Sequence, residues 1–230
     1  MLVSPGGAKS RMLKQLRAAA ETRLVPGRVY NQGGPFARGT IREATRERIL
    51  EGAMKAVSSH GLSNLEMTDV SVSAGVSRGT LYRYFSNRDE LLHSLTIREA
   101  HNFWTRCVEA LEDCERDEER LKLLMLHATR YVKEHAALQR LLETDPAFVL
   151  SSLKQSFTTV RDELGRLIVP ALENSGPVKA GVVSVDQLVD WLTRILVTAY
   201  LFPSEDNAAM ENAMESMHGM LQESGKNSEF

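Results

Sequence analysis

Cysteine and long hydrophobic runs are both scarce in this sequence, and each shortage excludes a class of protein. Two cysteines in 230 residues, Cys107 and Cys114, cannot build a disulfide framework, and they lack the paired spacing of a zinc site. The longest apolar run, residues 195–202, is far shorter than the ~20 residues that span a bilayer, and no signal peptide is recognisable. We therefore expect a cytoplasmic protein.

The usual motifs of cofactor binding and catalysis are missing as well. The six histidines show no metal-ligand spacing, and no glycine-rich phosphate loop, nucleophile elbow or dinucleotide fingerprint occurs. The sequence thus predicts no cofactor, no metal and no enzyme activity. Because Cys107 and Cys114 are seven residues apart, they can share a helix face, so a redox pair stays open beside the interpretation as two small core residues.

Charge is distributed unevenly, although the net charge of the whole chain is only −2. Residues 1–44 have eight basic and two acidic side chains, whereas residues 99–230 have 13 basic and 22 acidic ones. A basic N-terminal part joined to an acidic C-terminal part is typical of a protein that faces DNA with one end only.

Apolar residues recur at helical spacing and no alternating pattern predicts a strand, so we expect an all-α fold. Thr40 and Glu43 have the spacing of a capping box and open a helix that ends at His60-Gly61. A helix over 67–74, a turn at Gly75 and a helix from the N-cap Ser77 to residue 85 then predict a helix-turn-helix. Further helices are predicted over residues 89–114, 120–134, 137–142, 147–174, 185–202 and 207–223, and a short one over 11–23.

These elements suggest three parts. Residues 1–39 contain several glycine and proline turn signals and form a basic N-terminal extension that we expect to be flexible. Residues 40–86 form the predicted helix-turn-helix DNA-binding domain, and residues 87–230 form a larger helical domain.

The most distinctive run of the sequence is Ala-Gly-Val-Ser-Arg-Gly-Thr-Leu-Tyr-Arg-Tyr-Phe, residues 74–85. With Ile49-Leu50, Gly61, Val70 and Leu91-Leu92, this run resembles the TetR family of bacterial transcriptional regulators, of the TetR/AcrR type, over residues 42–98. The resemblance implies a homodimeric repressor in the bacterial cytoplasm. Such a protein binds a palindromic operator and is released by a small-molecule ligand in its C-terminal ligand-binding and dimerisation domain.

Two residues depart from the family pattern. Glu66 stands at the N-cap of the second helix, where the family usually has serine or threonine, and Ser71 replaces the usual alanine. Glutamate caps a helix poorly, so we expect the second helix to begin differently or to fray.

The helix that starts at Ser77 is the predicted recognition helix. Leu81 and Phe85 are one turn apart and anchor it inward, which leaves the opposite side for the major groove. There Arg78 and Arg83 can read guanine edges, Gly79 permits close approach, and the threonine and tyrosine hydroxyls can bond phosphates. The predicted DNA-binding residues are Arg42, Arg46, Thr68, Ser77, Arg78, Gly79, Thr80, Tyr82, Arg83, Tyr84 and Arg88.

Several of these assignments have open alternatives. The tyrosines can instead be core aromatics, and Arg42 and Arg46, which we interpret as a basic arm, can be solvated charge. Arg88 takes its role from the resemblance, since the family usually has a phosphate-contacting lysine there.

Beyond residue 98 no motif assigns a function, so the ligand pocket and the dimer interface are implied by the resemblance alone. Large or adaptable side chains are candidates for the pocket and favour a hydrophobic ligand: Phe103, Trp104, Met125, His127, Tyr131, Phe148, Phe157, Trp191 and Tyr200. Apolar stripes on the last two helices are candidates for the dimer interface: Leu188, Leu192, Ile195, Met210, Met214, Met217 and Leu221. An intramolecular core uses the same spacing, so both sets remain open to that use.

Two other functions stay open at this point. The helical part could be an enzyme or a small-molecule carrier with a vestigial DNA-binding head, which turnover of a bound compound would reveal. A structural DNA-binding protein would instead bind all sequences alike with a steep salt dependence, although such proteins tend to be basic throughout.

Overall fold

In the computed structural model, residues 36–112, 114, 116–202, 212, 215, 216 and 219 are described. These residues form helices and turns without a strand, which confirms the all-α fold class for this part of the chain. None of its helices is long and apolar enough to cross a membrane. The helix predicted over 11–23 lies outside the described residues, and so does most of the one predicted over 207–223.

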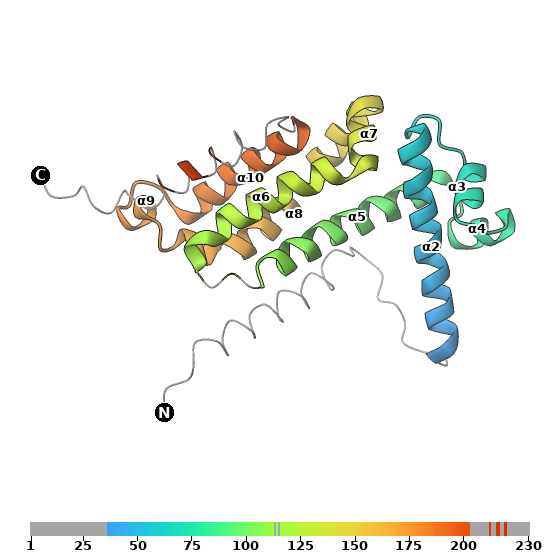
Figure 1. Ribbon diagram of the computed structural model, residues 1–230, viewed down its shortest axis with the longest axis horizontal. Helices are drawn as coiled ribbons and strands as arrows, with labels where there is room; N and C mark the ends of the chain where they lie inside the picture. The colour runs from blue at the N-terminus through green and yellow to red at the C-terminus, as the bar shows by residue number, and fades with distance from the viewer. Residues whose placement is uncertain are drawn as a thin grey trace, which may run out of the picture. The chain divides into compact units, whose positions relative to one another are not determined.

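The described residues divide into two compact units (Figure 1). The head consists of residues 36–102 and 135–150, and the body consists of residues 103–134 and 151–202. Two helices, α5 (Arg88–Ala110) and α8 (Pro146–Leu172), begin in the head and continue in the body. Residues 87–102 and 135–150 thus group with the helix-turn-helix, although the sequence placed them in the second domain.

The head is built from α2 (Phe36–His60), α3 (Met67–Ser73), α4 (Arg78–Tyr84), the first part of α5, and α7 (Ala136–Thr144). One apolar cluster joins these helices and contains Ile49, Leu50, Ala53, Ala56, Val57, Leu62, Leu65, Val70, Ala74, Leu81, Phe85, Leu91, Leu92, Leu95 and Ala137. Leu141 and Phe148 pack against it from the second segment of the head. Residues far apart in sequence therefore share one core.

The helix ends follow local rules, with two corrections. Gly75 has a φ of +61°, and the Ser77 hydroxyl accepts the Thr80 N–H at 3.1 Å, as a turn and an N-cap require. The predicted start at Thr40 is wrong, because α2 already begins at Phe36. The predicted end of the next long helix at Cys114 is also wrong, because α5 ends at Ala110.

The second helix begins cleanly despite the unfavourable Glu66. The Asp69 carboxylate, three residues later, accepts the Glu66 N–H at 3.0 Å. This bond is the reciprocal half of a capping box, so the acidic residue inside the first turn compensates for the weak N-cap. The α3 helix consequently starts at Met67, as the spacing predicted.

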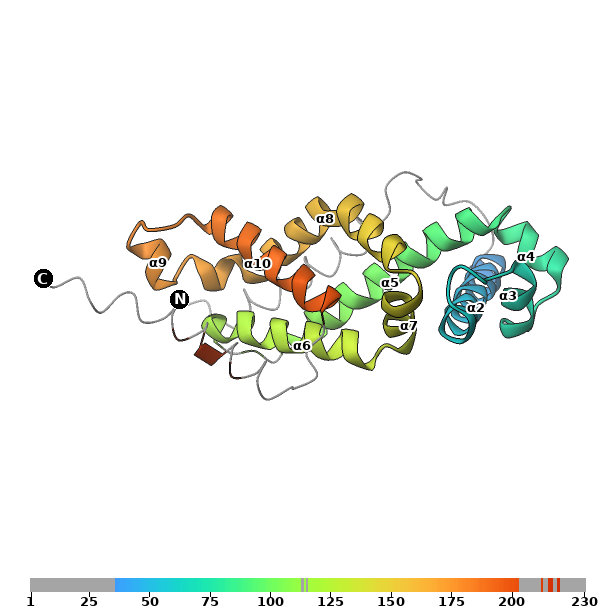
Figure 2. The same cartoon turned by 90° about the horizontal axis from the view of Figure 1, so that it is seen from above.

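The body contains the short turn η1 (Asp117–Glu119), α6 (Arg120–Glu134), most of α8, α9 (Gly176–Lys179) and α10 (Val185–Leu201). Figure 2 shows α6 and α10 running side by side, and the two helices are in contact. The largest buried side chains here include Leu124, Met125, Leu164, Ile168 and, unusually, the fully buried Arg120. Helix α8 continues through Pro170 and ends two residues later.

Candidate nucleic-acid interface

The orientation of α4 agrees with the prediction from its sequence. Leu81 and Phe85 are buried in the head core, at 0% and 1% exposure. The other side of the helix is open to solvent and includes Arg78, Gly79, Tyr82 and Arg83. Gly79 has open space around it, since a Cβ placed there would meet only the Ser77 hydroxyl, at 4.0 Å. A partner can therefore approach the backbone of α4 closely at this position.

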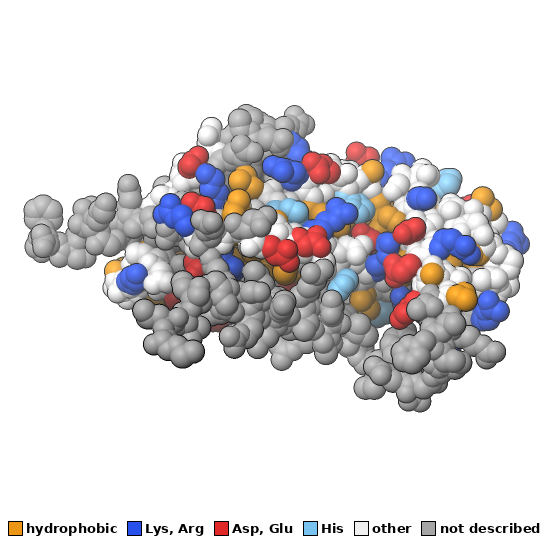
Figure 3. Space-filling model, turned by 60° about the horizontal axis from the view of Figure 1, so that its bottom comes forward, with side chains coloured by type: hydrophobic (Ala, Val, Ile, Leu, Met, Phe, Trp, Pro, Cys, Tyr) orange, Lys and Arg blue, Asp and Glu red, His pale blue; other side chains and the backbone are white. Residues whose placement is uncertain are grey.

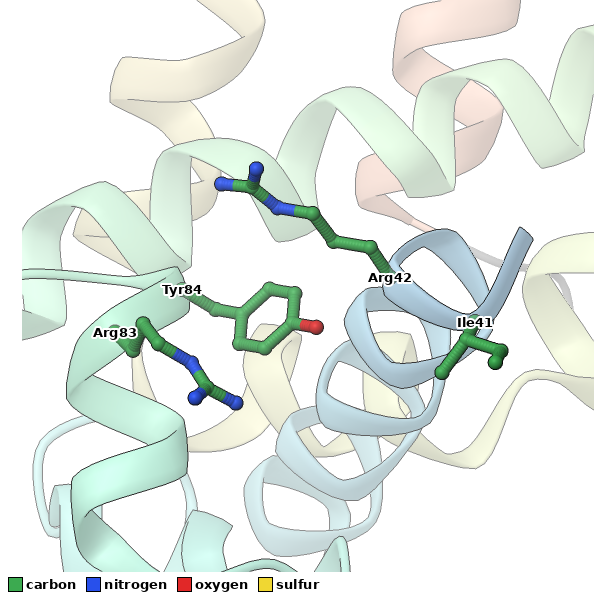
Figure 4. A pocket seen from close by; sticks show the side chains of 4 residues that line it. All are labelled: Ile41, Arg42, Arg83 and Tyr84. Carbon is green, nitrogen blue, oxygen red and sulfur yellow. The ribbon is translucent and has the colours of Figure 1, made fainter. Parts of the chain in front are cut away.

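A cleft of about 540 Å³ lies beside α4 and is lined by Ile41 and Arg42 of α2 and by Arg83 and Tyr84 of α4. Figure 4 shows the Tyr84 ring between the side chains of the two arginines, with its hydroxyl pointing toward α2. The Arg83 guanidinium carbon is 5.8 Å from the centre of that ring. Two cations and a hydroxyl donor in one cleft are suited to a phosphate group.

Several other residues predicted to contact DNA make contacts within the head. The Arg46 guanidinium carbon lies 5.4 Å from the centre of the Phe85 ring, in a cation–π contact. The Ser77 and Thr80 hydroxyls lie 2.9 Å apart and hydrogen-bond each other. The Thr68 carbonyl accepts the Ser71 hydroxyl at 2.8 Å, which satisfies the serine that replaces the usual alanine.

Arg88 has a structural role that the sequence did not reveal. Its Nε donates to the Leu65 carbonyl at 3.1 Å, and its Nη2 donates to the Leu62 carbonyl. The N-terminus of α5, on which Arg88 lies, is also capped by its own chain, because the Asn87 Oδ1 accepts the Glu90 N–H at 2.9 Å. The geometry therefore favours a structural role for Arg88, in which it hydrogen-bonds the backbone of the head, over a phosphate contact.

The electrostatic setting of the head suits a polyanion. On the face shown in Figure 3, the charged side chains visible at the far right-hand end are mostly basic, and acidic ones lie further to the left. Neighbouring glutamates are used in ion pairs, since Arg98 bonds Glu47 at 2.7 Å and Glu99 at 3.0 Å. Basic charge on an exposed surface of this kind attracts the phosphate backbone at long range.

Three of the nine pocket candidates meet in the body, Phe103, Trp104 and Tyr131, and Met125 and His127 lie on α6 together with Tyr131. The Phe103 ring packs edge-on against Trp104 and Tyr131, with ring centres 4.8 and 5.2 Å apart. The His127 Nε2 is buried and has no hydrogen-bond partner among the residues that the structure describes. Burial, followed by the charges of Arg106 and Arg130, lowers the pKa of His127. A neutral imidazole with an unsatisfied nitrogen thus lies one turn from Tyr131.

The other pocket candidates are placed elsewhere. Phe148 belongs to the head and packs against its core. Phe157 has the Arg194 guanidinium carbon 5.1 Å from its ring centre, Trp191 is 50% exposed, and Tyr200 is half-buried. Phe148 therefore lies in a different unit from the aromatic group around Phe103.

The dimer candidates within the described residues are mostly internal. Leu188 and Leu192 are buried in the body, at 7% and 0% exposure, and Ile195 is half-buried. The exposed apolar side chains of this region are instead Trp191 and Phe202. Met210, Met214, Met217 and Leu221 lie outside the described residues.

Comparisons with known proteins find similarity to bacterial transcriptional regulators. The model of the bacterial regulatory proteins of the tetR family matches residues 49–95. An uncharacterized HTH-type transcriptional regulator of Mycobacterium tuberculosis is 26% identical over 167 residues, 72% of this chain and 79% of that protein. The HTH-type transcriptional repressor KstR of Rhodococcus jostii is 29% identical over 157 residues, 65% of this chain and 73% of KstR.

A solved structure extends the likeness to the fold. A TetR-family transcriptional regulator of Pectobacterium atrosepticum superposes with a TM-score of 0.58 at 22% identity, over 79% of this chain and 94% of that one. At this level of identity the likeness concerns the arrangement of the helices.

Proposed function

Because the chain is a DNA-binding transcriptional regulator of the TetR family, we propose that it is a homodimeric repressor of a palindromic operator. A small molecule bound in the body releases it from DNA. The observation that carries this proposal is the cleft of Arg42, Arg83 and Tyr84 beside the solvent-facing side of α4.

DNA contact at α4 divides into two kinds. Arg78 and Gly79 lie in the first turn of the helix, the part that enters a major groove, so Arg78 reads a base edge. Arg42 and Arg83 bind a backbone phosphate in the cleft, with the Tyr84 hydroxyl as a third donor. The first kind of contact selects a sequence and the second fixes the register on it.

The homodimer is proposed on the free side of α10. Trp191 and the C-cap residue Phe202 are 50% and 73% exposed and lie on the same side of α10 as the half-buried Ile195, because eleven residues make about three turns. A second copy of the chain covers these side chains. Leu188 and Leu192 lie behind that surface, since the body itself buries them. Two heads are then available for two half-sites.

The ligand is proposed to lie beside the aromatic group of the body. Phe103 and Tyr131 offer apolar ring surface, and the unsatisfied Nε2 of His127 offers one hydrogen bond. A largely hydrophobic compound with one polar group matches this set. This compound releases the operator because it binds more tightly to a form of the dimer in which the spacing of the two heads does not match the two half-sites.

The test is a selection from random duplexes with the purified chain, followed by binding of the enriched and the scrambled duplex at several salt concentrations. We expect a palindrome preferred by several kcal/mol, in the range of specific protein–DNA complexes, ~4–10 kcal/mol. Arg42→Ala and Arg83→Ala should weaken binding to both duplexes and each lower the salt slope by about one. Arg78→Ala should reduce the preference for one base pair.

Lys154→Ala is the matched control, because it removes one positive charge from an exposed position on α8 in the body. It should change neither the preference nor the salt slope. A folded dimer that binds the enriched and scrambled duplexes equally would contradict the proposal and favour a structural DNA-binding protein. Sedimentation of Trp191→Ser, expected to be monomeric, tests the dimer separately.

A further inference from the structure

The turn between α2 and α3, residues 61–66, is held from one side by the junction of α7 and α8. The Asp145 Oδ2 accepts the Leu62 N–H at 2.9 Å, and its Oδ1 accepts the Ser63 hydroxyl in a short hydrogen bond. The Thr144 hydroxyl donates to the same carboxylate at 2.6 Å. The bonds from Leu62 and Ser63 connect residues more than 80 positions apart in the sequence, so they are tertiary contacts and not local caps.

The same turn is held from the other side by the first residue of α5. Arg88 donates to the carbonyls of Leu62 and Leu65. The backbone of Leu62 therefore bonds two side chains at once: its N–H is taken by Asp145 and its C=O by Arg88. Both bonds involve a charged group, which makes them stronger than bonds between neutral groups.

The turn also approaches the α7–α8 junction closely. Gly61 has a φ of +75°, and a Cβ placed on it would be 3.0 Å from the Thr144 hydroxyl oxygen. Leu62 and Leu65, which follow Gly61 in the turn, are buried in the head core. The six residues are thus fixed by packing as well as by hydrogen bonds, and α3 begins directly after them at Met67.

The two helices that hold the turn are the two that continue into the body. Arg88 is the first residue of α5, and Asp145 immediately precedes Pro146, the first residue of α8. Any change in the distance between the starts of α5 and α8 must therefore be absorbed in the turn at residues 61–66. Such a change would move α3, and α4 packed against it, without touching a DNA-contacting residue.

We propose that Asp145 is a positioning residue for DNA recognition: its bonds to Leu62 and Ser63, opposite those of Arg88, hold α3 and α4 in the DNA-binding arrangement. This inference rests on the proposed function and adds the point at which the body acts on the head. Asp145 does not touch DNA. Its effect on affinity passes through the turn at residues 61–66.

The experiment combines hydrogen exchange with operator binding for the full chain. Asp145→Ala should speed exchange of the Leu62 amide and of the peptide over residues 61–66. It should also weaken operator binding about tenfold or more, as expected for the loss of hydrogen bonds to a charged group. Asp145→Asn keeps one acceptor for the Leu62 N–H and should restore part of both. Glu173→Ala, which removes an exposed carboxylate just beyond α8, should change neither.

A milder variant protects the test against simple unfolding. Ser63→Ala removes only the hydroxyl bond and should weaken operator binding less than Asp145→Ala, with far-UV circular dichroism unchanged. Unchanged exchange in Asp145→Ala would overturn the inference, and so would faster exchange with unchanged operator affinity. If the wild-type chain showed no operator preference, the proposed function would fail and the positioning role with it, while the exchange data would still report the contact.

Discussion

Gly52 of α2 lies directly against Ala74, the C-cap of α3, and replacing it by alanine gives a test of the head packing. A Cβ on Gly52 would lie 2.6 Å from the N, Cα and Cβ atoms of Ala74. Carbon atoms pack best at about 3.5–4.0 Å, so α3 would have to move away from α2 by roughly 1 Å. The obstructing atoms include backbone, which cannot rotate aside.

Two opposing effects set the magnitude for Gly52→Ala. Overpacking a core costs about 1–3 kcal/mol, whereas alanine gains up to about 1 kcal/mol over glycine in a helix. Because the clash is with backbone, we expect overpacking to win and the head to lose about 1–2 kcal/mol. The midpoint of thermal unfolding should fall by about 2–4 °C for each kcal/mol lost. Operator affinity should fall as well, because α3 supports α4.

The assay can separate the head from the body. Both tryptophans, Trp104 and Trp191, belong to the body, so their fluorescence follows the body while far-UV circular dichroism follows both units. Urea unfolding of Gly52→Ala should shift the dichroism curve to lower urea more than the fluorescence curve. Gly79→Ala is the control, because its Cβ meets open space. It should keep or gain stability and lose only DNA affinity, and a Gly52→Ala protein as stable as the wild type would refute the reasoning.

Three further predictions concern the body. Burial and nearby arginines lower the pKa of His127 in the folded chain below its ordinary value of 6.5. Below pH 6.5 the unfolded chain therefore binds a proton at His127 more readily than the folded chain does, so the folded state loses stability as pH falls. The urea midpoint of the wild type should therefore drop between pH 7.5 and 5.5 more than that of His127→Gln. Arg120 is fully buried, and within the described part of the chain its Nη2 has no hydrogen-bond partner and Asp117 is its one charged partner, so Arg120→Met should be as stable as the wild type or more stable. Asp117→Ala should be less stable than either, and the opposite order in urea unfolding would contradict this. Burial raises the pKa of the Cys107 thiol, so a thiol reagent at pH 8 should label it only after unfolding, whereas labelling of the native chain would favour the redox interpretation.

The local geometry of the helix-turn-helix could be predicted because it depends on residues that are close together in the sequence. Gly75 is needed for a positive φ, Ser77 caps the helix that follows it, and Leu81 and Phe85 are one turn apart, so each rule acts within a few residues. The DNA-facing side of α4 follows from the inward anchors by elimination. The start of α2 was missed for the opposite reason, since a capping-box spacing at Thr40 does not stop a helix from beginning earlier at Phe36.

The long-range hydrogen bonds and packing contacts of the head could not be predicted, because the residues that make them also fit a local structural role. An aspartate before a proline is typical of a helix N-terminus, yet the Asp145 carboxylate bonds the turn at residues 61–66. Arg88 matches a phosphate-contact position, yet its guanidinium bonds two carbonyls. Helical periodicity likewise cannot show that Ala137 packs in the head rather than in the body.

These two kinds of residue explain how one small head can be both specific and adjustable. A helix of seven residues, such as α4, is too short to be stable alone, so its orientation is fixed by what packs behind it. In the proposed function, the side chains of α4 that face DNA therefore determine which sequence is bound, whereas Gly52, Leu62 and Asp145 determine whether α4 is in place to bind it. Because the second group lies inside the head, where α5 and α8 begin, the proposal lets DNA affinity change without any change in the side chains proposed to contact DNA.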